Sequence, residues 1–485
     1  MISFQNVTFS YPNDPQNGLK SISLTIPKGQ CVLLCGPSGC GKTTLTRLLN
    51  GLIPQFFPGE LTGRVLLDGE DLAGLPMYRI AEKVGSVFQN PRTQFFNVDA
   101  DSEIAFGIEN EALPQPALKA RVARTAEELG IRPLLDRSIF ALSGGEKQKI
   151  AFASVYAMEP EVYLLDEPSS NLDAAAIAGL REHLKFIKAQ GKTVIIAEHR
   201  LYYLMDVADR VLFLENGRIC GDWTPARFRE LPLETRRKMG LRAVDLLEEQ
   251  PAFREPPAAP PLLTLEDVTL SYPERPVLKA LSLQAAPGEV IAVAGHNGAG
   301  KTTFSRALCG LHRESAGRFL WNGVPQKPKA RKQRAYLVMQ DVNYQLFAES
   351  VAAECTFGLK NPDAALGEKV LADLGLSPFR ERHPNTLSGG QKQRLAAAAA
   401  LVCGKELLVF DEPTSGLDYD SMTRLSALIR QLAEMGKVLF LVTHDYEFVC
   451  RTATRVLHLD GGGIQEDLPV TPETLPAIRR IFDVR

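Results

Sequence analysis

Short apolar runs alternate with longer amphipathic stretches along the chain. Residues 31–35 and 290–294 are apolar runs that end in glycine-rich loops. Such runs are typical of strands buried on both faces of a parallel sheet. Further runs of this kind lie at 162–165, 193–197, 407–410 and 438–442. The pattern predicts an α/β fold, in which helices cover both faces of a mainly parallel sheet.

The second half of the chain repeats the first half. The stretch 6–12 (NVTFSYP) returns at 267–273 as DVTLSYP, and the later motifs return in the same order. Self-similarity over this length indicates a duplicated domain. The residues that return in the same order, with spacing changed only by loop-sized deletions, are Lys42 and Lys301, Gln89 and Gln340, Ser143 and Ser388, Asp166 and Asp411, and His199 and His444.

The domain boundary is expected between the two copies. We predict one domain at 1–225, a helical segment with a proline-rich linker at 226–262, a second domain at 263–465, and a C-terminal tail at 466–485. Basic and apolar residues mix over 228–249, which predicts a helix that packs on its own domain or contacts a membrane surface or a partner. Prolines crowd 251–261, which predicts an extended connection.

Each first buried strand leads into the motif G-x-x-x-x-G-K-T. Glycines let successive backbone N–H groups and the following helix N-terminus face phosphate, while the lysine reaches the β- and γ-phosphates and the threonine hydroxyl binds Mg²⁺. The motif predicts a nucleoside triphosphate site in each half. Its residues are Gly36, Pro37, Ser38, Gly39, Cys40, Gly41, Lys42, Thr43 and Thr44, and Gly295, His296, Asn297, Gly298, Ala299, Gly300, Lys301, Thr302 and Thr303.

Two adjacent carboxylates end a later buried strand in each half. They are Asp166 with Glu167, and Asp411 with Glu412. An aspartate at this position can hold Mg²⁺, and a glutamate beside it can orient or deprotonate an attacking water, which is the positioning that phosphoryl transfer needs.

A serine and two glycines open a helical stretch ahead of each carboxylate pair. These residues are Ser143, Gly144 and Gly145, and Ser388, Gly389 and Gly390. A helix that starts in this way caps itself and also offers N–H groups to an anion. The pattern L-S-G-G-x-x-Q, placed before a strand that ends in Asp-Glu, resembles the signature of the ABC ATPase family. The resemblance spans nearly the whole chain and implies two tandem P-loop NTPase domains of ABC type, each with a mainly parallel sheet core, an N-terminal antiparallel β part and a helical subdomain.

The resemblance implies roles for further residues. Tyr11 and Tyr272 would stack on adenine, Gln89 and Gln340 would meet Mg²⁺ and the attacking water, and His199 and His444 would contact the γ-phosphate. Residues 171–173 and 416–418 would form the loop that crosses a dimer interface.

The same resemblance implies that the two halves form an intramolecular ABC dimer. The loop at 36–43 would meet Ser388, Gly389 and Gly390, and the loop at 295–302 would meet Ser143, Gly144 and Gly145, with ATP and Mg²⁺ between them. Since both halves carry every one of these motifs, we expect both sites to hydrolyse ATP.

Residues after each glutamine are similar to those of energy-coupling factor (ECF) importer ATPases. The first half reads QNPRTQFF and then AFG, whereas the second reads QDVNYQLF and then TFG, which departs from the pattern. The resemblance implies a transmembrane coupling subunit and a membrane subunit that captures a vitamin or a transition-metal ion, with this chain peripheral at the cytoplasmic face of the cell membrane. An apolar loop such as Phe95-Phe96 or Leu346-Phe347 suits a groove for a partner helix.

Charge and composition narrow the function classes. The formal net charge is −2, so no global field attracts nucleic acid, and we expect no nucleic-acid partner. No apolar run approaches the ~20 residues of a spanning helix, and the N-terminus shows no secretory signal. The eight cysteines lack zinc-site or redox spacing and are expected to be reduced.

Other ABC proteins remain as alternatives. A fused ATPase of sugar importers usually has an altered second phosphate loop, whereas Gly300-Lys301-Thr302 is intact here. Soluble tandem ABC proteins that act on ribosomes usually carry a long lysine-rich linker, whereas the linker here is short, proline-rich and not strongly basic. DNA-repair ABC ATPases carry zinc modules or long heptad insertions, and the sequence shows neither.

Overall fold

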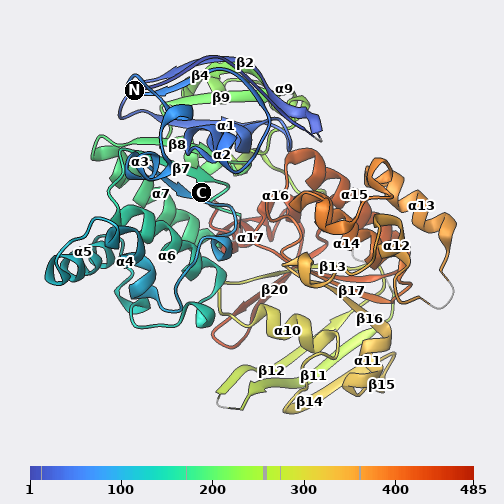
Figure 1. Cartoon of the computed structure of the whole chain (residues 1–485). Helices are drawn as coiled ribbons and strands as arrows, with labels where there is room; N and C mark the ends of the chain where they lie inside the picture. Colours follow the sequence, from blue (N-terminus) through green and yellow to red (C-terminus); the bar gives the residue numbers. More distant parts are fainter. Residues whose placement is uncertain (13, 171, 255–258, 274, 360–361, 485) are drawn as a thin grey trace. The chain divides into compact units, whose positions relative to one another are not determined.

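The chain forms two compact units, Met1–Val244 and Asp245–Arg485. The computed structural model describes residues 1–12, 14–170, 172–254, 259–273, 275–359 and 362–484. Within those ranges the two units have matching strand orders in their sheets and a similar succession of helices, which agrees with the predicted duplication (Figure 1).

Two sheets build unit 1. A four-stranded antiparallel sheet has the order β2-β1-β4-β5, and a six-stranded sheet has the order β10-β9-β3-β8-β7-β6. All neighbours in the second sheet are parallel except β10, which pairs antiparallel with β9 at one edge. The strands are β1 (Ile2–Tyr11), β2 (Asp14–Ile26), β3 (Cys31–Cys35), β4 (Glu60–Leu67), β5 (Glu70–Asp71), β6 (Val84–Val87), β7 (Val162–Asp166), β8 (Thr193–Ala197), β9 (Arg210–Glu215) and β10 (Arg218–Trp223).

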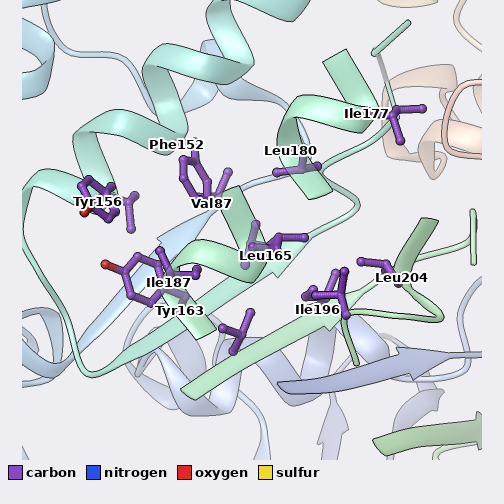
Figure 2. Packing of buried hydrophobic residues seen from close by; sticks show 14 of the residues in the cluster. Val87, Phe152, Tyr156, Tyr163, Leu165, Ile177, Leu180, Ile187, Ile196 and Leu204 are labelled. Carbon is purple, nitrogen blue, oxygen red and sulfur yellow. The ribbon is translucent and has the colours of Figure 1, made fainter. Parts of the chain in front are cut away.

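Helices cover both faces of this six-stranded sheet. The helices of unit 1 are α1 (Lys42–Leu49), α2 (Leu52–Gln55), α3 (Met77–Lys83), α4 (Ala100–Glu109), α5 (Gln115–Glu128), α6 (Gly144–Ala157), α7 (Ala174–Ala189), α8 (Pro225–Arg229) and α9 (Leu233–Lys238). One face packs on α1 and the antiparallel sheet. The other packs on α4 to α7, where Phe152 and Tyr156 from α6 and Leu180 from α7 meet Val87 and Leu165 from the strands (Figure 2).

Unit 2 repeats this plan with sheet orders β12-β11-β14-β15 and β16-β17-β18-β13-β19-β20. Its strands are β11 (Leu263–Tyr272), β12 (Arg275–Ala285), β13 (Val290–Ala294), β14 (Ala316–Trp321), β15 (Val324–Pro325), β16 (Ala335–Val338), β17 (Leu407–Asp411), β18 (Val438–Val442), β19 (Arg455–Asp460) and β20 (Gly463–Pro469). Its helices are α10 (Lys301–Leu308), α11 (Pro328–Arg334), α12 (Val351–Thr356), α13 (Ala364–Asp373), α14 (Gly389–Val402), α15 (Tyr419–Glu434), α16 (Tyr446–Thr452) and α17 (Leu475–Ile481).

The buried runs form the predicted strands. Residues 31–35, 193–197, 290–294 and 438–442 are β3, β8, β13 and β18, and the other two runs lie within β7 and β17. The predicted fold class is therefore confirmed.

The predicted long helix at 228–249 is wrong. Two short helices, α8 and α9, and a 3₁₀ turn at Leu246–Glu248 replace it. Pro232 stands at the start of α9, and Gly240 ends that helix with a φ of +69°. A residue with left-handed backbone angles ends an α-helix. The apolar residues Leu241 and Val244 therefore belong to an irregular segment, in which both are buried. The division between the two units falls inside the 226–262 segment.

Residues 466–485 are largely part of unit 2. Most of β20 and all of α17 lie here, and Val470, Ile478 and Phe482 join a buried cluster with Tyr446 and Val449 of α16. The segment therefore adds to the core of the unit.

Candidate functional site

The two phosphate loops depend on glycine for their shape. In unit 1 the loop joins β3 to α1, and Gly41 precedes the helix with a φ of +110°. A Cβ on Gly36 would lie 2.1 Å from the Leu214 carbonyl oxygen, and a Cβ on Gly295 would lie 2.2 Å from that of Leu459. No side chain fits at either position, so the strand and loop come close only because these residues are glycines.

Each lysine of the motif lies inside its own loop. Lys42 Nζ donates to the carbonyl oxygens of Gly36 at 2.8 Å and Pro37 at 3.1 Å. Lys301 Nζ donates to those of Gly295 at 2.6 Å and His296 at 3.0 Å. Both side chains are buried. A cation beside a helix N-terminus, in a loop rich in glycine, fits a phosphate group.

A threonine and an aspartate stand together at each site. Thr43 Oγ1 lies 3.4 Å from Asp166 Oδ1, and Thr302 Oγ1 lies 3.3 Å from Asp411 Oδ2. Burial raises the pKa of Asp166 to about 6, with the neighbouring charge of Glu167 acting in the same direction. Burial also raises the pKa of Asp411. Hydroxyl and carboxylate oxygens are the ligands that Mg²⁺ prefers, and a cation would stabilise the charged carboxylates, so the residues present fit this ion.

Space for a ligand adjoins the site of unit 1. A cavity of about 320 Å³ is lined by Thr43, Arg47, Gln89 and Asp166, among others. These residues come from α1, from the segment after β6 and from the end of β7. The cavity therefore opens beside the hydroxyl and carboxylate that fit Mg²⁺.

Sheet register brings the glutamate and the histidine of each unit together. Asp166 pairs with Ala197 and Asp411 pairs with Val442, so the residues that follow them share one edge. His199 Nε2 lies 3.4 Å from Glu167 Oε1, and His444 Nε2 lies 3.4 Å from Glu412 Oε1.

Both glutamates have a left-handed backbone, with φ of +45° at Glu167 and +49° at Glu412. This conformation is unfavourable for a residue with a side chain and concentrates at functional sites. A hydrogen bond holds it in each unit, because the Glu167 N–H donates to the Ala197 carbonyl and the Glu412 N–H donates to the Val442 carbonyl, each at 2.8 Å.

The predicted glutamines occupy equivalent places in the two units. Gln89 Nε2 donates to Glu167 Oε2 at 2.5 Å, so unit 1 gathers glutamine, glutamate and histidine at one point. Gln340 lies two residues beyond the end of β16, and it is exposed, as Gln89 is.

The signature serines act as helix caps. Ser143 and Ser388 precede α6 and α14, and each forms a reciprocal capping box, with Glu146 and with Gln391 respectively. A Cβ on Gly144 or on Gly389 would find nothing within 4 Å, so the first turn of each helix presents an open face. The predicted helix starts are confirmed, and the predicted contact with nucleotide stays a prediction.

The two tyrosines lie in unlike surroundings. The Tyr11 hydroxyl lies 3.2 Å from both Thr44 Oγ1 and Arg47, and its ring packs edge-on against Phe9. The Tyr272 ring is exposed and lies 5.0 Å from the His312 ring. Stacking on adenine stays a prediction for both.

The predicted interface loops follow the carboxylate strands. Asn171 lies outside the described residues. Asp173 caps α7 by accepting from the Ala176 N–H at 2.8 Å, and Asp418 caps α15 by accepting from the Ser421 N–H at 2.8 Å.

The sequence patterns did not single out several buried residues at the first site. Glu198, Arg200 and Tyr203 are all buried beside His199. One signal was available, because two charged residues flank a histidine at the end of an apolar strand, and charges at such a place are buried only with partners.

The fold and the two loops define each unit as a P-loop nucleotide-binding domain with the residues of an ATPase. A family profile described as ABC transporter matches residues 19–170 and 278–415, so it matches a large part of each unit. The chain belongs to the ABC transporter family and is a tandem ATPase with two ABC domains.

Several known proteins are similar to this chain in sequence or in fold. A Treponema denticola protein, whose name describes an ABC transporter ATP-binding protein, is 51% identical over 475 residues, which are 96% of this chain and 97% of that protein. Among solved structures, cbiO1 from Clostridium perfringens is 29% identical over 50% of this chain and 94% of its own, with a TM-score of 0.44. A model of ribosome-bound archaeal Pelota and ABCE1 has a TM-score of 0.71 at 20% identity, over 98% of this chain and 80% of that chain, which shows a shared fold.

Two further properties concern membrane-spanning segments and cysteines. In the part of the chain that the structure describes, no helix has both the length and the apolar character that crossing a membrane requires. The eight cysteines are free thiols, and most of them are buried.

Proposed function

We propose that this chain is the energy-coupling ATPase of an ECF-type importer for a vitamin or a transition-metal ion. In this proposal ATP and Mg²⁺ bind at Lys42, Thr43 and Asp166 in unit 1 and at Lys301, Thr302 and Asp411 in unit 2. Glu167 and Glu412 orient the attacking water, and His199 and His444 contact the γ-phosphate. The observation that carries the proposal is that both units hold the lysine inside its loop, the threonine beside the aspartate, and the glutamate beside the histidine.

ATP supplies a phosphoanhydride bond, and Mg²⁺ supplies charge neutralisation at the phosphates. The residues of this chain then have separate tasks. The lysine ammonium and the helix N-terminus hold phosphate, while the glutamate carboxylate holds or accepts the proton of water. The signature serine and glycines of one unit would complete the site of the other unit, so that binding joins the halves. Because the halves belong to one chain, this closure is intramolecular.

Exposed aromatic side chains support a protein partner. In unit 1, Phe96 is 74% exposed and Phe106 is 40% exposed, and their rings stack with centroids 4.8 Å apart. In unit 2, Phe347 is 68% exposed and Phe357 is 59% exposed, with centroids 6.4 Å apart. We call these two pairs the aromatic patches. Contiguous exposed aromatic rings are typical of protein contact surfaces.

The loop beneath each patch is fixed by a buried glutamate. Glu103 Oε2 accepts from the N–H groups of Phe96 and Asn97, at 3.0 and 2.9 Å. Glu354 Oε2 accepts from those of Phe347 and Ala348, at 2.8 and 2.7 Å.

The inner residues of the predicted apolar loops belong to the core, because Phe95 packs against the main cluster and Leu346 is buried. The side chains of the outer residues, Phe96 and Phe347, are therefore exposed and available to contact a partner. Each patch also lies in the segment that follows the predicted sensor glutamine, so a partner there could respond to the nucleotide.

The proposal predicts that the aromatic patches bind the membrane partner. Phe96→Ser combined with Phe106→Ser should abolish co-purification of integral membrane proteins from detergent-solubilised membranes. ATP turnover by the isolated chain should stay within about twofold of the original, because both rings are exposed and neither belongs to the predicted site residues. Mass spectrometry of affinity-purified chain measures the first outcome, and phosphate release measures the second.

Phe56→Ser is the matched control, since Phe56 is 67% exposed and lies outside the patches. It should leave co-purification intact. Recovery of ribosomes in place of membrane proteins, with the unaltered chain, would contradict the importer proposal.

A further inference from the structure

The histidines of the two units have different neighbours. Glu198 and Arg200 flank His199, whereas Thr443 and Asp445 flank His444. Strands and loops around the two histidines otherwise correspond, because β3-β8-β7 in unit 1 matches β13-β18-β17 in unit 2. The residue before the histidine is therefore a buried glutamate in unit 1 and a buried threonine in unit 2, where the buried carboxylate of Asp445 follows the histidine instead.

Glu198 is the centre of a hydrogen-bond network. Its side chain is 2% exposed and accepts four hydrogen bonds. Oε1 accepts from the N–H groups of His199 at 2.7 Å and Arg200 at 3.1 Å. Oε2 accepts from the N–H of Ser169 at 3.3 Å and from the hydroxyl of Tyr203 at 3.0 Å. A buried carboxylate with this many donors fixes the atoms that donate to it.

This network joins two loops that carry site residues. Ser169 lies two residues after Glu167, and His199 follows Glu198 directly. Arg200 strengthens the link, since its guanidinium donates to the carbonyl oxygens of Ser169 at 3.3 Å and Leu172 at 3.5 Å. The loop after β7 and the loop after β8 are therefore held together from beneath the site.

In unit 2 the site glutamate itself accepts a hydrogen bond from the backbone of the histidine. There the His444 N–H donates to Glu412 Oε2 at 3.4 Å. The Thr443 hydroxyl accepts from the Asp445 N–H at 3.1 Å. One oxygen of Glu412 is thus engaged by the backbone of the histidine.

In unit 1 the hydrogen bond from the histidine backbone goes to Glu198 instead of Glu167, because Glu198 accepts the His199 N–H. Glu167 Oε2 accepts from Gln89 at 2.5 Å, and Glu167 Oε1 lies 3.4 Å from His199 Nε2. Both oxygens of Glu167 therefore face groups predicted to act on water and phosphate.

We propose that Glu198 is a positioning residue for hydrolysis in unit 1, holding the His199 backbone and Ser169 so that both oxygens of Glu167 serve the site. The inference rests on the proposed role of Glu167. It makes the two sites unequal in mechanism, since hydrolysis at Glu167 depends on Glu198, whereas hydrolysis at Glu412 does not.

The test separates the two sites by silencing one glutamate at a time. In a Glu412→Gln chain, turnover reports the site of unit 1, and Glu198→Thr should lower kcat by about tenfold while KM for ATP changes less than about twofold. Glu198→Gln keeps one oxygen for the His199 N–H and should restore most of the lost kcat. In a Glu167→Gln chain, where turnover reports unit 2, Glu198→Thr should leave kcat unchanged.

Melting temperatures of all variants distinguish misplacement from unfolding. Unchanged kcat for Glu198→Thr in the Glu412→Gln chain, or an equal loss in both chains, overturns the proposal. If the chains with one silenced glutamate are both inactive, Glu198→Thr and its counterpart Thr443→Val are compared in the otherwise unaltered chain. Glu198→Thr must then lower kcat by more than Thr443→Val, and an equal effect overturns the proposal. A normal rate for Glu167→Gln alone is a different result, because it refutes the proposed role of Glu167.

Discussion

Replacement of both Glu167 and Glu412 by glutamine is expected to lower kcat for ATP by about 100-fold or more, which is the range for removal of a catalytic base. Glutamine keeps the shape of the side chain but cannot accept a proton from water. The glutamates lie 3.4 Å from His199 and His444, and the Glu167 side chain is largely buried, so solvent offers no ready substitute. Phosphate release at saturating ATP measures the effect.

The single variants give more information than the double variant. Each should retain turnover from the remaining glutamate, because both units hold a matching glutamate and histidine. Wild-type turnover in either single variant would show that its site is silent. Nucleotide binding should persist in all three variants, which separates a loss of chemistry from a loss of affinity.

Replacement of both Lys42 and Lys301 by alanine is expected to remove ATP turnover and solute uptake. Each ammonium donates to carbonyl oxygens of its own phosphate loop, so it is placed to meet phosphate. Loss of one preorganised positive group commonly costs about 100-fold or more in rate. Lys329→Ala is a suitable control, because Lys329 is an exposed lysine of α11.

Binding of a fluorescent ATP analogue and phosphate release measure this prediction in the purified chain. Uptake is measured in vesicles that contain the chain with its co-purified membrane subunits. Unaltered turnover and uptake in the double lysine variant would contradict the proposed phosphate sites.

Local motifs allowed much of each site to be predicted from the sequence. The phosphate loops, the carboxylate pairs and the signature helices are short segments whose residue types fix their own backbone, as the glycines at 36 and 295 illustrate. Parallel pairing then brings the ends of β7 and β8 together, so Glu167 meets His199 without any further information.

Features that depend on distant parts of the chain could not be predicted in this way. The helix expected at 228–249 is broken by Pro232 and Gly240, and its apolar residues are buried by the unit around them. The sequence predicted a C-terminal tail at residues 466–485, yet Ile478 and Phe482 pack in a buried cluster with residues of α16. The partners of Glu198 could not be predicted either, because Ser169 comes from another loop.

The central claim is that each unit completes the nucleotide site of the other, and one distance tests it most directly. Arg218 follows Gly217, whose N–H donates to the Cys40 carbonyl of the first phosphate loop at 3.0 Å, and Asn385 lies just before Ser388. Both residues are exposed and accept a cysteine. Spin labels on Arg218→Cys and Asn385→Cys, in a Glu167→Gln and Glu412→Gln chain with Cys220→Ser, report the approach of the first loop to the second signature.

Addition of Mg²⁺ and ATP should shorten the measured distance between the two labels. The shortening should disappear when Lys42→Ala and Lys301→Ala are added. A distance that does not change with ATP, in a chain that binds nucleotide at both loops, would contradict the account.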